Sequence, residues 1–131
     1  MIIVGRTALV TGATGGIGQA IARRLHRSGA DLILSGRRTE VLEPLAAELG
    51  GATRVLAADL ADRADVARLA SACADVDIVV ANAALPASGP LEGFTPEEVD
   101  RALEVNLRAP VMLARLLAPG MVERGAGQLV F

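Results

Sequence analysis

A glycine-rich segment near the N-terminus, residues 11–18, has the residue types and the spacing that can hold a phosphate group. It lies between an apolar run and a stretch with helical periodicity, so the helix would direct its unpaired N–H groups and positive dipole end into the turn. We expect Gly12 to take backbone angles that other residues avoid, Gly16 to let the main chain approach a phosphate, and Gly18 to let the helix pack closely. The segment predicts a dinucleotide site, and the alternative is a flexible turn without a ligand. The expected contact residues are Thr11, Gly12, Thr14, Gly15, Gly16, Ile17 and Gly18.

The residues after the second expected strand bear on the type of dinucleotide. Gly36, Arg37 and Arg38 follow that strand directly, at the position that lies beside the adenosine ribose in dinucleotide-binding folds. An acidic side chain there would accept a hydrogen bond from the ribose 2′-hydroxyl, whereas two guanidinium groups attract a 2′-phosphate. The segment therefore favours NADP(H) over NAD(H), and the alternative is that both arginines are solvated surface residues.

The elements that would position these residues alternate along the chain, because short apolar runs are separated by longer helical patterns. The run at residues 76–81 shows no apolar–polar alternation, which predicts a strand covered on both faces. This order predicts an α/β fold with a Rossmann-type, doubly wound parallel sheet and its ligand at the carboxyl ends of the strands. The expected strands are residues 7–11, 31–35, 52–57, 76–81 and 128–131.

Periodicity and capping residues predict the helices. The first helix would bury an apolar stripe made of Ile17, Ile21 and Leu25. Residues 95–98, Thr-Pro-Glu-Glu, form a capping box with proline at the first helical position. The expected helices are residues 16–28, 39–49, 62–72 and 95–117, with Thr39, Asp62 and Thr95 as the capping residues of the last three.

Composition excludes several classes of function. The chain has 131 residues, 52% of them apolar, which is enough for one globular domain with a substantial core. A net charge of −2 and only two aromatic residues argue against nucleic acid as a partner. Charged residues and prolines interrupt the apolar stretches, so we expect no membrane segment and no export signal. We expect Cys73 to be a small buried residue in a reducing cytoplasm, and the lone His26 to be solvated rather than a metal ligand.

These motifs together resemble those of the short-chain dehydrogenase/reductase family. Thr11, Gly12, Gly16 and Gly18 match its pattern Thr-Gly-x-x-x-Gly-x-Gly. Gly15 also satisfies the Thr-Gly-x-x-Gly-x-x-Gly pattern of the extended, epimerase-like branch, so the loop alone leaves both branches open. Later segments are similar to the shorter reductase branch, and with them the resemblance covers the whole chain: residues 104–107, 119–121 and 127–130.

The resemblance implies further cofactor contacts. Asp59 and Leu60 are similar to the family's Asp-Val/Leu pair near the adenine. Residues 81–84, Ala-Asn-Ala-Ala, resemble its Asn-Asn-Ala-Gly motif, with alanine in place of the first asparagine and of the glycine. The contacts that this second motif implies are Asn82, Ala83 and Ala84.

One catalytic residue is also implied by the resemblance. In the family, the helix asparagine that matches Asn106 kinks its helix and holds a water of the proton relay through its main chain. The alternative is an asparagine that is merely tolerated in a helix, at about 0.5 kcal/mol relative to alanine. The family's other catalytic residues are a tyrosine, a lysine four residues later and a serine just beyond the fifth strand. This chain has no tyrosine and no lysine, and its serines precede the fifth strand, so we expect no hydride transfer by the chain alone.

We therefore expect residues 1–131 to be the NADP(H)-binding domain of a reductase, ending inside the fifth of seven strands. The intact enzyme would transfer hydride between NADP(H) and a small carbonyl or alcohol substrate, and the alternative is a non-catalytic nucleotide-binding or regulatory module. The long helix carries more apolar residues than one sheet face needs, and with the resemblance this implies a homodimer or homotetramer. These residues are Val99, Leu103, Leu107, Val111 and Leu116.

Overall fold

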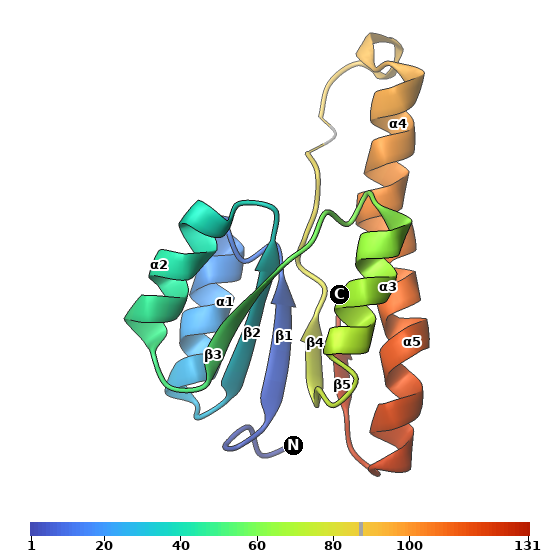
Figure 1. Cartoon of the computed structure of the whole chain (residues 1–131). Helices are drawn as coiled ribbons and strands as arrows, with labels where there is room; N and C mark the ends of the chain where they lie inside the picture. The colour runs from blue at the N-terminus through green and yellow to red at the C-terminus, as the bar shows by residue number, and fades with distance from the viewer. Residues whose placement is uncertain (87) are drawn as a thin grey trace.

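A five-stranded parallel sheet forms the centre of the computed structural model, which describes residues 1–86 and 88–131 (Figure 1). The strand order is β3-β2-β1-β4-β5, so the direction of chain progression reverses between β1 and β4. This reversal confirms the predicted doubly wound, Rossmann-type sheet. The strands are β1 (Thr7–Thr11), β2 (Asp31–Gly36), β3 (Thr53–Ala57), β4 (Ile78–Val80) and β5 (Gln128–Val130).

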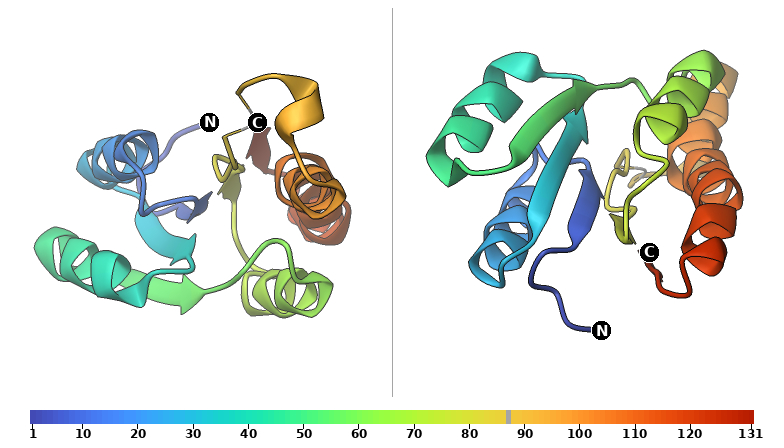
Figure 2. Two further views of the ribbon diagram at one scale, coloured as in Figure 1. Left: turned by 90° about the horizontal axis from the view of Figure 1, so that it is seen from above. Right: turned by 60° about the horizontal axis from the view of Figure 1, so that its bottom comes forward.

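Helices cover both faces of the sheet. Helices α1 (Gly16–Arg27) and α2 (Thr39–Leu49) lie on one side, and α3 (Arg63–Ala72) and α5 (Ala109–Glu123) lie on the other, as the view from above in Figure 2 shows. Alternate strand residues therefore enter two separate cores. Leu32 and Leu34 of β2 pack toward α1 and α2, whereas Ile33 between them packs toward α3 and α5. Burial on both faces is why these strands read as unbroken apolar runs.

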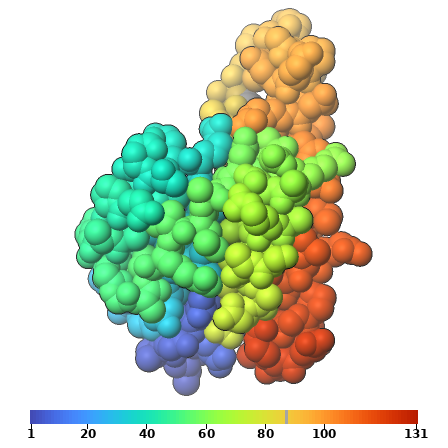
Figure 3. Space-filling model, viewed as in Figure 1, coloured from blue at the N-terminus to red at the C-terminus, as the bar shows by residue number. Residues whose placement is uncertain are grey.

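The segment before α5 carries the chain beyond the carboxyl edge of the sheet. Helix α4 (Pro96–Leu103) is preceded by the short 3₁₀ helix η1 (Leu91–Gly93) and continues through the π-helical segment η2 (Glu104–Arg108) into α5. Figure 3 shows the segment around η1 and the beginning of α4 projecting beyond the body of the molecule. The predicted capping box is confirmed, because the Thr95 hydroxyl accepts from the Glu98 N–H and the Glu98 carboxylate accepts from the Thr95 N–H.

Some expected helix boundaries were wrong. The long helix continues past Leu117 to Glu123, because Leu113, Leu117 and Met121 keep a buried face at a spacing of four residues and packing outweighs the internal Pro119. Thr39 is not an N-cap. Arg38 occupies that position without a side-chain capping bond, and Thr39 is already helical.

Other boundaries moved by one or two residues. Strand β2 extends to Gly36, β3 begins at Thr53, and β4 and β5 are shorter than expected. Asp62 caps α3 as predicted, since its carboxylate accepts hydrogen bonds from the N–H groups of Ala64 and Asp65.

The burial of two apolar side chains was predicted, and the prediction is wrong for one of them. Ile17 is not part of the buried stripe of α1. It is 72% exposed, whereas Ile21 and Leu25 pack against the core. Cys73 is fully buried at the end of α3, as expected, and burial raises the pKa of its thiol to about 11.

No helix within residues 1–86 and 88–131 is both long and apolar enough to span a membrane. His26 is half-buried rather than fully solvated. In the same part of the chain, no group of three His, Cys, Asp or Glu side chains is placed to hold a metal ion.

Candidate functional site

A cleft of about 530 Å³ lies at the carboxyl ends of the strands, the edge toward which the arrows of Figure 1 point. It is open to solvent and crosses the point where the strand order reverses. Every predicted cofactor contact except Thr11 lines it. The lining residues are Gly12, Thr14, Gly15, Gly16, Ile17, Gly18, Gly36, Arg37, Arg38, Ala58, Asp59, Leu60, Asn82, Ala83, Ala84, Leu85, Pro86, Arg101 and Val105.

The glycines of the β1–α1 turn differ in what surrounds them. Gly12 has a φ of +64°, and a Cβ there would lie 2.7 Å from the Cα of Ala83, so both its conformation and its neighbour require glycine. A Cβ on Gly18 would collide with the carbonyl oxygen of Gly12 and lie 2.9 Å from the Cα of Ala13. Gly18 therefore packs against the turn itself. A Cβ on Gly16 would meet no protein atom within 4 Å, because this position faces open space.

Thr11 supports the cleft from behind its wall instead of lining it. Its side chain is buried, and its hydroxyl accepts from the Ala83 N–H at 3.1 Å and donates to the Val80 carbonyl at 3.4 Å. The Asn82 amide donates to the carbonyls of Thr11 and Gly12 at 3.3 and 3.2 Å. These bonds fasten the end of β4 to the turn after β1.

The end of β2 presents two cations to the cleft. Arg37 and Arg38 are both exposed, and among the residues that the structure describes neither forms an ion pair. Glu40 and Glu43 on the following helix form no ion pair with them. Because α2 also begins here, its positive dipole end adds to the charge of the guanidinium groups, and the site favours an anion.

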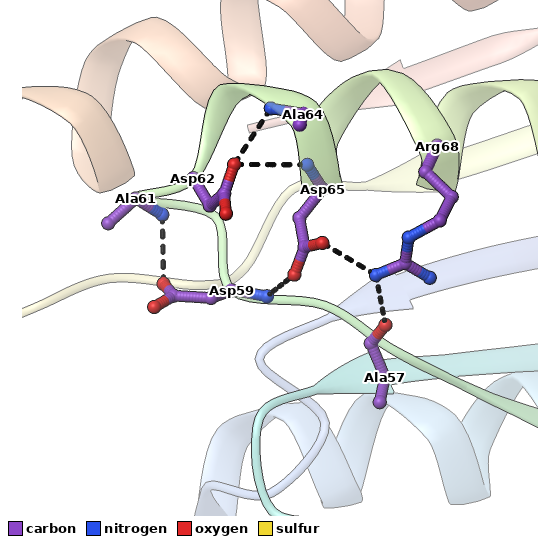
Figure 4. Close-up of polar contacts among 7 residues, drawn as sticks. All are labelled: Ala57, Asp59, Ala61, Asp62, Ala64, Asp65 and Arg68. Atoms are coloured by element: carbon purple, nitrogen blue, oxygen red, sulfur yellow. Dashed lines mark hydrogen bonds and ion pairs between the residues drawn. The ribbon is translucent and has the colours of Figure 1, made fainter.

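The loop between β3 and α3 holds Asp59 in place (Figure 4). The Asp59 N–H donates to the Asp65 carboxylate at 2.8 Å, and the Asp59 carboxylate accepts from the Ala61 N–H at 3.0 Å. Arg68 donates to Asp65 at 2.7 Å and to the Ala57 carbonyl at 3.3 Å. The Asp59 N–H and, after it, the Arg68 guanidinium lower the pKa of the Asp65 carboxyl. Asp65 thus holds in place the backbone of the loop from which Asp59 and Leu60 line the cleft.

Asn106 fixes the segment that leaves β4. Its side-chain oxygen accepts from the Leu85 N–H at 2.7 Å, and its amide donates to the Leu85 carbonyl at 3.0 Å. Asn106 lies in the middle of η2, where the Ala109 N–H bonds to the Glu104 carbonyl five residues back instead of four. The residue itself does not line the cleft, whereas its partner Leu85 does.

The sequence matches the model of the short chain dehydrogenase family over residues 6–131. The chain belongs to the short-chain dehydrogenase/reductase family. Members of this family bind nicotinamide cofactors, act on small-molecule substrates and are commonly oligomeric. A nicotinamide cofactor is therefore the class of ligand that members of this family bind.

Two relatives illustrate the similarity in sequence. Nodulation protein G of Rhizobium sp. (strain N33) is 46% identical over 132 residues, which cover 98% of this chain and 54% of that protein. The 3-oxoacyl-[acyl-carrier-protein] reductase of Rickettsia conorii is 33% identical over 128 residues, covering 98% of this chain and 53% of the reductase. The chain thus spans about half the length of the curated relatives it matches.

Solved structures agree with the fold. A short-chain dehydrogenase from Sphingobium yanoikuyae in complex with NADPH superposes with a TM-score of 0.90 at 36% identity, covering 95% of this chain and 51% of that one. A metagenomic short-chain oxidoreductase in complex with NADP also gives a TM-score of 0.90 at 36% identity, covering 98% of this chain and 62% of that one.

Sequence reasoning missed five residues of this short-chain dehydrogenase cleft. Ala58 and Val105 are ordinary apolar residues that carry no local signal. Leu85 and Pro86 follow directly after the Asn82 motif, so extending that motif would have found them. Arg101 comes from α4 and belongs to none of the motifs that predict the other polar lining residues. The missed residues are Ala58, Leu85, Pro86, Arg101 and Val105.

Proposed function

We propose that this chain is the NADP(H)-binding portion of a short-chain dehydrogenase/reductase. In the intact enzyme, hydride would pass between NADP(H) and a small carbonyl or alcohol substrate. The observation that carries the proposal is the pair Arg37 and Arg38, two guanidinium groups without carboxylate partners in the described residues, at the end of β2 in a cleft that suits a dinucleotide.

The residues present fit the cofactor. The open space at Gly16 and the exposed N–H groups at the start of α1 would receive the pyrophosphate. Arg37 and Arg38 would hold the 2′-phosphate, because β2 neighbours β1 on the adenosine side of the sheet. Asp59 and Leu60, at the end of the next strand, would contact the base.

The nicotinamide half would lie over β4, on the other side of the switch point, which is the place between β1 and β4 where the strand order reverses. There Asn82, Ala83 and Ala84 would contact the cofactor, and Leu85 and Pro86 extend the wall. When bound, the cofactor supplies or accepts the hydride. Asn106 would act as a positioning residue on this side, since its two hydrogen bonds hold Leu85 in the cleft wall.

The relatives support this assignment. One of them is named as a 3-oxoacyl-[acyl-carrier-protein] reductase, and the two solved structures carry NADPH and NADP. Arg37 and Arg38 give a physical reason to expect a cofactor with a 2′-phosphate in this chain too. The reductase name supports a carbonyl compound as the substrate class of the intact enzyme.

Cofactor titration by calorimetry tests the proposal. Charge-assisted hydrogen bonds contribute about 1.5–3 kcal/mol, so NADPH should bind roughly ten- to a hundredfold more tightly than NADH. The double variant Arg37→Ala/Arg38→Ala should lose this preference by weakening NADPH alone. Arg24→Ala, an exposed arginine of α1 outside the cleft, is the matched control and should change neither affinity. Equal affinities of the unmutated chain for both cofactors would overturn the proposal.

We also propose that the intact enzyme is a homodimer or homotetramer that uses the outer face of α4, η2 and α5. Five apolar side chains on this face are between 39% and 60% exposed: Val99, Leu103, Leu107, Val111 and Leu116. Sedimentation should show self-association at micromolar concentration, and Leu103→Glu/Leu107→Glu should reduce it. A monodisperse monomer of the unmutated chain under these conditions would contradict the proposal.

A further inference from the structure

Arg101 is the one cation that α4 contributes to the cleft among the residues that the structure describes. Its Nη2 atom lies 3.4 Å from the Oδ1 atom of Asp59, forty-two positions earlier in the chain, and its side chain is 39% exposed. Arg101 also lines a second, largely apolar cavity of about 560 Å³ that lies beside the cleft. The guanidinium therefore lies in the wall between the cleft and this second cavity.

The strand order identifies the end of the cleft at which Arg101 lies. The pyrophosphate position is the turn after β1, and the cleft continues over β2 and then β3 on one side and over β4 on the other. Asp59 follows β3, beyond the ribose position at the end of β2. Arg101, paired with Asp59, thus lies where the adenine base would be.

The free N–H donors and the flat guanidinium of this pair suit a purine base. The Asp59 Oδ1 atom already accepts from the Ala61 N–H, which fixes its carboxylate, and the carboxylate in turn holds the guanidinium. A guanidinium is planar and carries five N–H donors, of which Asp59 accepts one bond. Its remaining donors can reach ring nitrogens, and its plane can stack on an aromatic ring.

A second ion pair, between η2 and α3, connects neighbouring elements without facing the ligand space. Arg63 pairs with Glu104, one helical turn beyond Arg101, and neither partner lines either cavity. The pair of Arg101 and Asp59 joins α4 to the β3–α3 loop and lines the cleft. The other pair joins η2 to α3 and lines neither space. This difference separates a binding role from a structural one.

We propose that Arg101 contacts the adenine base directly and raises the affinity of the cleft for the adenosine half of the cofactor. The proposal rests on the function proposed above. It assigns a ligand contact to a side chain that none of the sequence motifs contains, and Asp59 acts as the group that holds the guanidinium in place.

The test uses the two halves of the cofactor as separate probes. Adenosine 2′,5′-bisphosphate and reduced nicotinamide mononucleotide are titrated by calorimetry into the full chain and its Arg101→Met variant, which keeps the length of the side chain and removes its donors. We expect about a five- to twentyfold loss of affinity for the bisphosphate and no change for the mononucleotide. Arg63→Met, which removes the other ion pair, should leave both affinities unchanged.

A double-mutant cycle separates direct contact from an effect through Asp59. In the Asp59→Asn background, where no carboxylate is left unpaired, Arg101→Met should still weaken bisphosphate binding severalfold. If the loss disappears in that background, Arg101 acts only by neutralising Asp59 and the proposal is wrong. If Arg101→Met does not fold, as judged by circular dichroism, Arg101→Lys replaces it and should lower the affinity at least about threefold, because it keeps the charge but not the planar fork.

The remaining outcomes are also decisive. An equal loss for both probes would indicate a general structural effect, and unchanged bisphosphate affinity would exclude the contact. If the unmutated chain binds NADPH and the bisphosphate but Arg101→Met binds them equally well, this inference alone fails. If the unmutated chain binds neither NADPH nor its halves, the proposed function fails with it.

Discussion

The two glycines at the start of α1 provide a direct test of how the turn works, because alanine should affect them in opposite ways. A Cβ on Gly18 would collide with the Gly12 carbonyl oxygen and lie 2.8 Å from its carbonyl carbon and 2.9 Å from the Cα of Ala13. All three atoms are backbone atoms, so no side chain can rotate away. At Gly16 the same Cβ would meet no protein atom within 4 Å, and the backbone there is not in the left-handed region.

The distances set the expected magnitudes. Inserting a methyl group into a closely packed site costs roughly 1–3 kcal/mol, and alanine regains up to about 1 kcal/mol of helix propensity. With a collision against rigid backbone, we expect Gly18→Ala to lower the free energy of unfolding by about 2 kcal/mol, or the Tm by roughly 6–10 °C. Gly16→Ala should be neutral or stabilise by a few tenths of a kcal/mol up to about 1 kcal/mol.

Cofactor affinity should separate the two variants further. The space at Gly16 is where the pyrophosphate would approach the main chain, so a methyl group there should weaken NADPH binding at least about tenfold in a fully folded protein. Gly18→Ala should lose both stability and binding. Urea unfolding measures the first property and calorimetric titration the second. If Gly16→Ala binds NADPH as tightly as the unmutated chain, the open space is not a phosphate site, and if Gly18→Ala is as stable, the packing argument is wrong.

Three further predictions concern two residues that support the cleft and the buried cysteine. Thr11→Val should lower the free energy of unfolding by about 1–2 kcal/mol, measured in urea, because the Ala83 N–H loses its acceptor. The pKa of Asp65 is lowered by its bonds to the Asp59 N–H and to a guanidinium, so the stability it contributes is present above the ordinary aspartate value of 3.8 and is lost as the pH falls through the lower value of the folded state. In Asp65→Asn, the free energy of unfolding should therefore fall less between pH 7 and pH 2 than it does in the unmutated chain. The Cys73 thiol, with its pKa of about 11 and full burial, should react with an aromatic disulfide at pH 8 far more slowly in the native chain than in guanidinium chloride.

The sheet could be predicted because its signals are local. Strand β4 contains only buried residues, and a strand covered on both faces shows this in its own composition. The capping box at Thr95 and the cap at Asp62 are equally local, since each involves residues within three positions. The end of α5 was misplaced because Pro119 is a strong local signal, whereas the packing of Leu117 and Met121 that overrides it is tertiary.

The residues of the site also differ in how local their sequence signals are. The glycine turn and the arginines after β2 were found because each motif is continuous in sequence. Thr11 belongs to the same motif, but its hydroxyl is turned toward Ala83 behind the cleft wall, which only the structure shows. Arg101 has no signal in the motifs at all. Its partner is forty-two positions away, and the contact exists only because α4 stands beside the β3–α3 loop.

Different kinds of contact hold the cleft at the switch point and at its adenosine end. At the switch point, the buried bond of the Thr11 hydroxyl to the Val80 carbonyl and the partly buried bonds of Thr11 and Asn82 join the end of β4 to the turn after β1. Removing them leaves polar groups at least partly buried and unpaired. At the adenosine end, the connections are partly exposed ion pairs such as that of Arg101 with Asp59, and such pairs contribute little to folding. Substitutions at the adenosine end should therefore change cofactor affinity with little effect on stability, whereas substitutions at the switch point should change both. Cofactor preference can then vary at the end of β2 and on α4 without disturbing the sheet that carries the site.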